Sequence, residues 1–224
     1  MRTSRNSTGF SIVELMVTMV IMLMVLGIIS TVTFRAFGVR ARESRTSDAL
    51  SSAQAALSVI SREVSNSGFG LYTDATNKVA DNGLVYADCD EHKIRVRSNL
   101  DNFGGTPEAP GETTLVINQP AEDVSYYFDD ATKSIVRYDP NGLGTGEPET
   151  SVVVNQISNI TFEYYNFTGT STPAQVTTPT VDTARVKITV EVELDRVAGQ
   201  PDNRTITLAS EVTLRNNSYM LQQY

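Results

Sequence analysis

An uncharged apolar run from Leu15 to Phe34 constrains this chain more than any other feature of its sequence. As an α-helix, these twenty residues would be about 30 Å long, which matches the hydrocarbon core of a bilayer. The run therefore predicts a membrane-spanning helix. Residues 1–9 carry Arg2 and Arg5 but no acidic residue, so we expect this segment to stay in the cytoplasm and the C-terminus to lie outside it.

The position of Gly9 distinguishes this N-terminus from an ordinary secretory signal. In such a signal, the small residues of the cleavage site follow the apolar region. Gly9 precedes it, so cleavage after Gly9 would remove a leader peptide, residues 1–9, and would leave the anchor in the mature protein.

Glu14 is the one charged residue at the edge of the apolar run. A carboxylate at this place needs a physical reason, because at the centre of a bilayer it costs about 2.5–3.5 kcal/mol. Cleavage after Gly9 would create a positive α-amine on Phe10, four positions before Glu14, and the two groups could pair. The alternative is that Glu14 is solvated among the lipid headgroups and stabilised by the helix N-terminus.

The segment GFSIVEL, residues 9–15, resembles the processing motif of type IV prepilins, and the basic leader and apolar helix accompany it. The resemblance implies cleavage between Gly9 and Phe10 by prepilin peptidase, followed by N-methylation of Phe10. It also implies that Glu14 neutralises the N-terminal amine of a neighbouring subunit. The implied partners are major and minor pilin subunits, the peptidase and an assembly platform in the bacterial inner membrane. The protein would pass from that membrane into a pilus filament at the cell surface.

A helical pattern continues after Phe34. Apolar residues recur at spacings of three and four, at Leu50, Ala53, Leu57, Ile60 and Val64. Gly68 and Gly70 then favour a stop. We therefore predict one N-terminal helix over residues 10–68, of which 10–34 form the transmembrane segment or filament core. We expect the apolar stripe to pack on the chain's own sheet rather than to form a coiled-coil seam.

Two further features of this helix bear on assembly. Four arginines follow the apolar run, and they form either a solvated ring of charge or a surface that meets acidic neighbours in a filament: Arg35, Arg40, Arg42 and Arg45. Many major pilins carry a proline inside the membrane part, whereas this chain reads IISTV over residues 28–32. Whether the helix partly melts on assembly is therefore open.

The pattern changes from a period of 3.6 to a period of 2 after about Leu71, which predicts a β-rich domain over residues 69–224 outside the cytoplasm. Two antiparallel hairpins are predicted, one from residues 184–195 and 204–216, the other over residues 124–139. Further strands are predicted over residues 93–98, 113–118, 150–155 and 159–167, and loops over 102–111, 142–149 and 168–179. The expected fold is α+β, a pilin fold with one long helix packed on an antiparallel sheet. The order of these segments resembles PilW-type minor pilins and the J-type pseudopilins of type II secretion.

The composition argues against several other functions. The net charge is −8, the opposite of what phosphate binding requires, so we expect no nucleic-acid partner. One cysteine and one histidine cannot form a disulfide or a Cys₂His₂ zinc site, and no P-loop occurs. The polar segment Asp88–His92 is interpreted as a solvated loop before a strand rather than as a metal site. The segment Asp139–Gly142 partly resembles a calcium loop, but it lacks the third ligand and a distal glutamate at the right spacing. We therefore predict no catalytic residue, no metal and no cofactor, and hence no enzyme.

These features predict a structural minor pilin that joins a type IV pilus through its N-terminal helix and initiates or caps the filament. A J-type pseudopilin of a type II secretion system would share the same N-terminal chemistry, so that alternative is open. A single-pass membrane-anchored binding protein is an alternative from another class, although it would need neither Gly9 nor Glu14.

Overall fold

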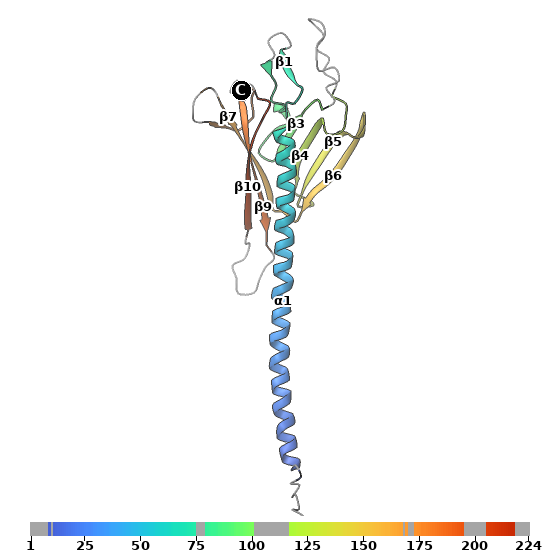
Figure 1. Cartoon of the computed structure of the whole chain (residues 1–224), viewed down its shortest axis with the longest axis vertical. Coiled ribbons are helices and arrows are strands. Elements are labelled where there is room, and N and C mark those ends of the chain that lie inside the picture. Colours follow the sequence, from blue (N-terminus) through green and yellow to red (C-terminus); the bar gives the residue numbers. More distant parts are fainter. Residues whose placement is uncertain are drawn as a thin grey trace, which may run out of the picture. The chain divides into compact units, whose positions relative to one another are not determined.

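A computed structural model describes residues 9, 11–74, 79–100, 117–167, 169, 173–194 and 205–217, the side chains of residues 72–80 excepted (Figure 1). The chain divides into two compact units, residues 1–47 and 48–224. The boundary lies inside the helix α1, Ile12–Ser65, which has 54 residues. The part of α1 that begins at Asp48 therefore belongs to the second unit.

The sequence of α1 suits one long helix. It contains no proline, and alanine, leucine, methionine and arginine supply helix propensity along most of its length. After Ser65 the chain leaves the helix through Gly68 and Gly70, whose φ angles are 77° and 69°. At Gly68 a Cβ would lie 2.1 Å from the carbonyl oxygen of Asp81, so only glycine fits this turn. The long N-terminal helix that the sequence predicts is confirmed.

The first large sheet of the second unit is an antiparallel meander. Its strands, in spatial order, are β3 (Lys93–Arg97), β4 (Asp123–Asp129), β5 (Ser134–Gly144) and β6 (Glu147–Asn155). The β4–β5 pair is the hairpin predicted over residues 124–139, with Phe128 opposite Ile135. The predicted strands over residues 93–98 and 150–155 correspond to β3 and β6.

The second large sheet is also antiparallel. Its order is β10 (Thr205–Thr213), β9 (Thr183–Glu193), β7 (Asn159–Asn166) and β8 (Ala174–Val176). The predicted hairpin of residues 184–195 and 204–216 is confirmed, with Val190 of β9 opposite Leu208 of β10. Two short elements precede the large sheets: the antiparallel pair β1 (Tyr72–Asp74) and β2 (Val79–Ala80), and the 3₁₀ turn η1 (Tyr86–Asp88).

One hydrophobic core joins both large sheets to the C-terminal part of α1. In β9 the apolar residues alternate with polar ones, so Val186, Ile188, Val190 and Val192 are all buried while the polar residues between them are half-buried. The stripe of α1 enters the same core through Ala53, Ala56, Leu57, Ile60 and Val64. The α+β architecture, one long helix packed on antiparallel sheets, is therefore confirmed.

Two of the predicted loops are wrong in part. Residues 142–149 form the turn region of a β-hairpin, because β5 runs to Gly144 and β6 starts at Glu147. Gly142 is required inside β5, since a Cβ there would lie 2.4 Å from the Cβ of Glu149 on β6. The loop expected over residues 168–179 contains the short strand β8.

The predicted strand over residues 113–118 is not present in the part of it that the structure describes, because Ile117 and Asn118 are not in a strand. Its other residues, 113–116, lie outside the described residues. The predicted loop over residues 102–111 lies outside them too.

Candidate functional site

The N-terminal segment presents Gly9 in an open environment. Nothing lies within 4 Å of the position that a Cβ on Gly9 would occupy, so packing within the described part of this chain does not require glycine there. Phe10 lies outside the described residues. α1 begins two residues later, at Ile12, and the amide of Leu15 donates to the carbonyl oxygen of Ser11 at 3.1 Å. Gly9 therefore stands in open surroundings, three residues before the first residue of α1.

Glu14 lies in the first turn of α1, and its side chain is exposed. The free backbone N–H groups of a helix N-terminus favour a negative charge at this place. Within the described residues, Glu14 has neither a hydrogen bond nor an ion pair from its side chain. Its carboxylate is therefore available to a cation from outside the described part of the chain.

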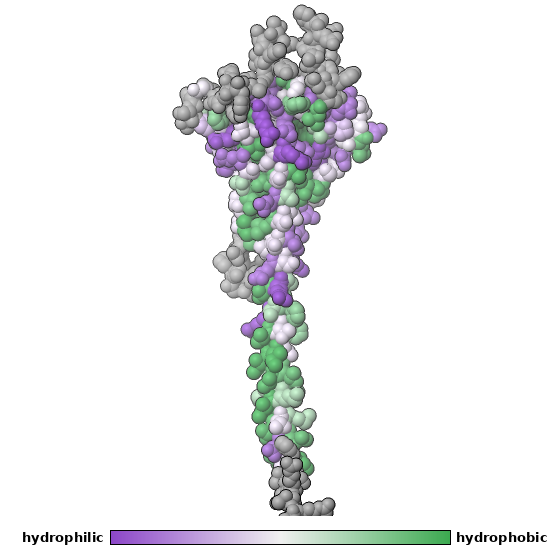
Figure 2. Space-filling view, in the orientation of Figure 1, coloured by the Kyte–Doolittle hydropathy of each residue, from purple (hydrophilic) through white to green (hydrophobic). Residues whose placement is uncertain are grey.

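The part of α1 in the first unit is apolar and exposed. All residues from Ile12 to Phe37 are exposed, including Leu15 at 56%, Leu23 at 66% and Phe34 at 78%. Figure 2 shows this stretch largely in green. Among the described residues, α1 is the helix that is long and apolar enough to cross a membrane. Such a surface is stable only when lipid or other apolar helices cover it.

The polar atoms within this apolar stretch are largely satisfied inside the helix. The hydroxyl groups of Thr18, Thr31 and Thr33 each donate to a backbone carbonyl oxygen three or four residues earlier, at 2.8 Å. In hydrocarbon an unpaired hydroxyl would cost several kcal/mol, so these bonds lower the cost of covering the helix with lipid.

A comparison with protein families matches the same segment. Residues 4–30 match the model of the prokaryotic N-terminal methylation motif. This match supports a type IV pilin-like protein. It also supports processing by prepilin peptidase and assembly with other pilins in a membrane, and proteins with this motif are generally structural rather than catalytic. No curated protein and no solved structure matches the chain.

A polar cluster ties α1 to the first sheet. The hydroxyl of Tyr126 on β4 donates to Oε2 of Glu63 on α1 at 2.7 Å, and Nε of Arg137 on β5 lies 3.4 Å from the same oxygen. Burial and the nearby Glu63 carboxylate both raise the pKa of Tyr126, so its hydroxyl remains a donor. This contact fixes the rotation of α1 about its axis relative to the core.

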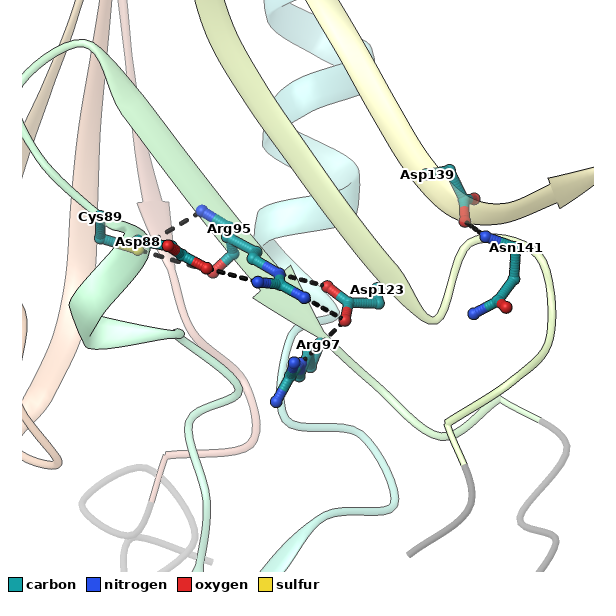
Figure 3. A network of polar contacts seen from close by, with 7 residues as sticks. All are labelled: Asp88, Cys89, Arg95, Arg97, Asp123, Asp139 and Asn141. Carbon is teal, nitrogen blue, oxygen red and sulfur yellow. Dashed lines mark hydrogen bonds and ion pairs between the residues drawn. The ribbon is translucent and has the colours of Figure 1, made fainter. Parts of the chain in front are cut away.

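A second network, shown in Figure 3, joins β3 to β4 through charged side chains. Arg95 forms a bidentate contact with the carboxylate of Asp123, in which Nε donates to Oδ1 at 2.7 Å and Nη2 donates to Oδ2 at 2.8 Å. Nε of Arg97 donates to the same Oδ2 at 3.0 Å. Arg95 also pairs with Asp88. Burial alone would raise the pKa of Asp123, but the hydrogen bonds and charges of the two arginines outweigh it and lower that pKa.

The polar segment Asp88–His92 contributes Asp88 to this network and Cys89 to the core. Burial raises the pKa of Cys89 to about 11, so the side chain is a neutral thiol at pH 7. The backbone amide of Arg95 lies 3.4 Å from Cys89 Sγ, and Nδ1 of His92 lies 2.8 Å from the carbonyl oxygen of Ile160. In the part of the chain that the structure describes, no group of three His, Cys, Asp or Glu side chains could hold a metal ion.

The segment that partly resembles a calcium loop also bonds within the protein. Asp139 is 1% exposed, and its carboxylate accepts hydrogen bonds from the backbone amides of Ala121 at 2.7 Å and Asn141 at 2.9 Å. Nη2 of Arg137 lies 3.3 Å from it. The carboxylate thus organises the start of β4 and the middle of β5.

Sequence reasoning missed both charged networks. The signal for one of them was present: Arg95 and Arg97 are two apart on a strand, so both point to the same face. Their acidic partner is Asp123, 28 and 26 residues further along the chain, and only the register of β3 on β4 brings it opposite them.

Proposed function

We propose that this chain is the precursor of a minor pilin of a type IV pilus, which initiates or caps the filament. Prepilin peptidase cleaves it after Gly9, Phe10 is N-methylated, and α1 then packs among the helices of other subunits. The observation that carries the proposal is the methylation motif at residues 4–30 directly on a helix with an exposed apolar surface.

Gly9 fits the role of a cleavage site because nothing around it within the described chain demands glycine. A peptidase that must bring its catalytic groups close to the backbone favours a residue without a side chain. Removal of residues 1–9 takes away Arg2 and Arg5 and leaves the apolar helix at the new N-terminus.

Glu14 fits the role of a partner for the N-terminal amine. In the membrane, the amine of Phe10 and the carboxylate of Glu14 can both reach water at the interface. In a filament core of packed apolar helices they cannot, and breaking a buried ion pair costs about 3–5 kcal/mol. A carboxylate with no other partner in the described residues is available for this contact.

The proposed orientation puts the second unit outside the cytoplasm. The leader charges Arg2 and Arg5 favour this orientation, but the larger number of arginines after the apolar run works against it: Arg35, Arg40, Arg42 and Arg45. The proposal therefore rests on the processing motif, whose leader is the segment that stays inside.

The test is the variant Glu14→Ala expressed in a host that assembles pili, with Glu43→Ala as the matched control, because Glu43 is an exposed glutamate of α1 beyond the apolar run. We expect both variants to be cleaved and found in membranes. Glu14→Ala should be depleted at least about 100-fold from sheared filaments, as the loss of a buried pair implies. Equal incorporation of the two variants would refute the pairing role. If Glu14→Ala were not cleaved, Glu14 would act in recognition by the peptidase instead.

A further inference from the structure

Three arginines of the first unit stand directly beyond the apolar run of α1. Arg35 and Arg40 are exposed, and Arg42 is partly exposed. None of the three side chains forms a hydrogen bond or ion pair within the described residues. The first acidic residue after Glu14 is Glu43, so the charge of this segment, which we name the arginine collar (Arg35, Arg40 and Arg42), is purely positive.

The depth of the arginine collar follows from helix geometry. At 1.5 Å per residue, the three Cα atoms lie about 1.5, 9 and 12 Å beyond Phe34, the last residue of the run. The headgroup layer extends roughly 5–8 Å beyond the hydrocarbon core on each side. An arginine side chain spans several ångströms more and can bend back towards the interface, so all three guanidinium groups reach this layer. Phe34 and Phe37 are 78% and 64% exposed and lie at the same boundary.

The directions of the three side chains distinguish between two kinds of partner. With 3.6 residues per turn, Arg42 lies about 20° from Arg35 around the helix axis, whereas Arg40 lies about 140° from Arg35. One acidic neighbouring protein would contact one side of the helix. A lipid surface surrounds the helix, so it can contact both sides.

We propose that the arginine collar binds the phosphate groups of anionic phospholipids and thereby holds α1 at a fixed depth in the bilayer. A guanidinium group presents a planar set of donors that matches phosphate oxygens in pairs. The proposal rests on the membrane anchoring in the proposed function, but it does not require filament assembly.

The experiment uses the full chain in lipid nanodiscs. The sequence contains no tryptophan, so Phe37→Trp gives a unique fluorophore beside the collar. Energy transfer from this tryptophan to labelled phosphatidylglycerol is compared with transfer to equally labelled phosphatidylcholine at the same mole fraction. The tested variant adds Arg35→Gln, Arg40→Gln and Arg42→Gln. The control adds Arg62→Gln and Arg215→Gln, which lie in the second unit.

In the protein with the intact collar and in the control, we expect phosphatidylglycerol to be enriched over phosphatidylcholine around the tryptophan. Each arginine should contribute about a fivefold preference, because one arginine near an anionic surface favours binding by about that factor. Salt should reduce this preference, and the triple variant should abolish it while its tryptophan emission still shows insertion. Equal transfer to both lipids with the intact collar would overturn the proposal. A preference that survives in the triple variant would overturn it too. Loss of the triple variant from filaments without any lipid preference would assign the collar to an acidic neighbouring subunit instead.

Discussion

Ile60→Ala tests whether the second half of α1 is held by the chain's own sheets. Ile60 is completely buried, and it belongs to the core cluster that also contains residues of both large sheets. The suitable protein is a fragment of residues 36–224, which begins beyond the apolar run and contains the whole second unit. The matched control is Val59→Ala, at a half-buried position of the same helix turn.

The expected magnitude follows from cavity formation. Truncation of a buried isoleucine to alanine costs about 2–5 kcal/mol in unfolding free energy, because the lost contacts are replaced only in part. For a domain of this size, each kcal/mol lowers the Tm by about 2–4 °C, so Ile60→Ala should lower it by about 4–20 °C. Val59→Ala should cost about 1 kcal/mol or less, since little apolar area is lost and alanine favours the helix.

The assay is thermal unfolding of the three proteins, followed by circular dichroism, together with their elution as monomers. If Ile60→Ala melted at the temperature of the parent fragment, the apolar stripe would face solvent or a partner, and the packing described above would be wrong. If Val59→Ala had the larger effect, the face of α1 assigned to the core would be the wrong one.

Two further predictions concern the second unit. Because Arg95 and Arg97 lower the pKa of Asp123, its ionised form stabilises the fold at neutral pH. This contribution should start to fall as the pH drops below the unfolded value of about 3.9, and it should be lost through the lower folded value. Asp123→Asn should therefore reduce the urea midpoint more at pH 7 than at pH 3. An equal effect at both pH values would contradict the assignment. Gly83 has a φ of +75°, and a Cβ there would lie 2.1 Å from the amide nitrogen of Gly68, so Gly83→Ala should prevent folding of the fragment. The control Gly38→Ala should fold, because nothing lies within 4 Å of a Cβ at that position. A soluble Gly83→Ala fragment with the circular dichroism spectrum of the folded parent would refute this prediction.

The sequence predicts those parts of the fold that depend on local periodicity. The apolar stripe of α1 and the alternation in β9 repeat every few residues, so each reveals both the element and its buried face. The same reasoning failed over residues 142–149, because the glycines and the proline within this stretch favour a loop when neighbours in the sequence alone are considered: Gly142, Gly144, Gly146 and Pro148. In the fold, Gly142 is needed for the close approach of β6 to β5.

Contacts between distant segments were beyond prediction. Glu63 meets Tyr126 and Arg137, which lie 63 and 74 residues away, only because α1 is placed on the sheet in one rotation. Nothing in the local sequence of Glu63 distinguishes it from an exposed glutamate. The N-terminal motif is the opposite case, since Gly9, Phe10 and Glu14 lie within six residues and its chemistry can be interpreted without the fold.

The intact mass of the protein purified from a host with an active prepilin peptidase decides whether this chain is processed as a prepilin. We predict a mature chain that begins at Phe10 and carries one additional methyl group on its N-terminal amine. Replacement of Gly9 by a bulky residue should leave the leader attached. A parent protein that still carries residues 1–9 in such a host would contradict the claim that this chain is a prepilin.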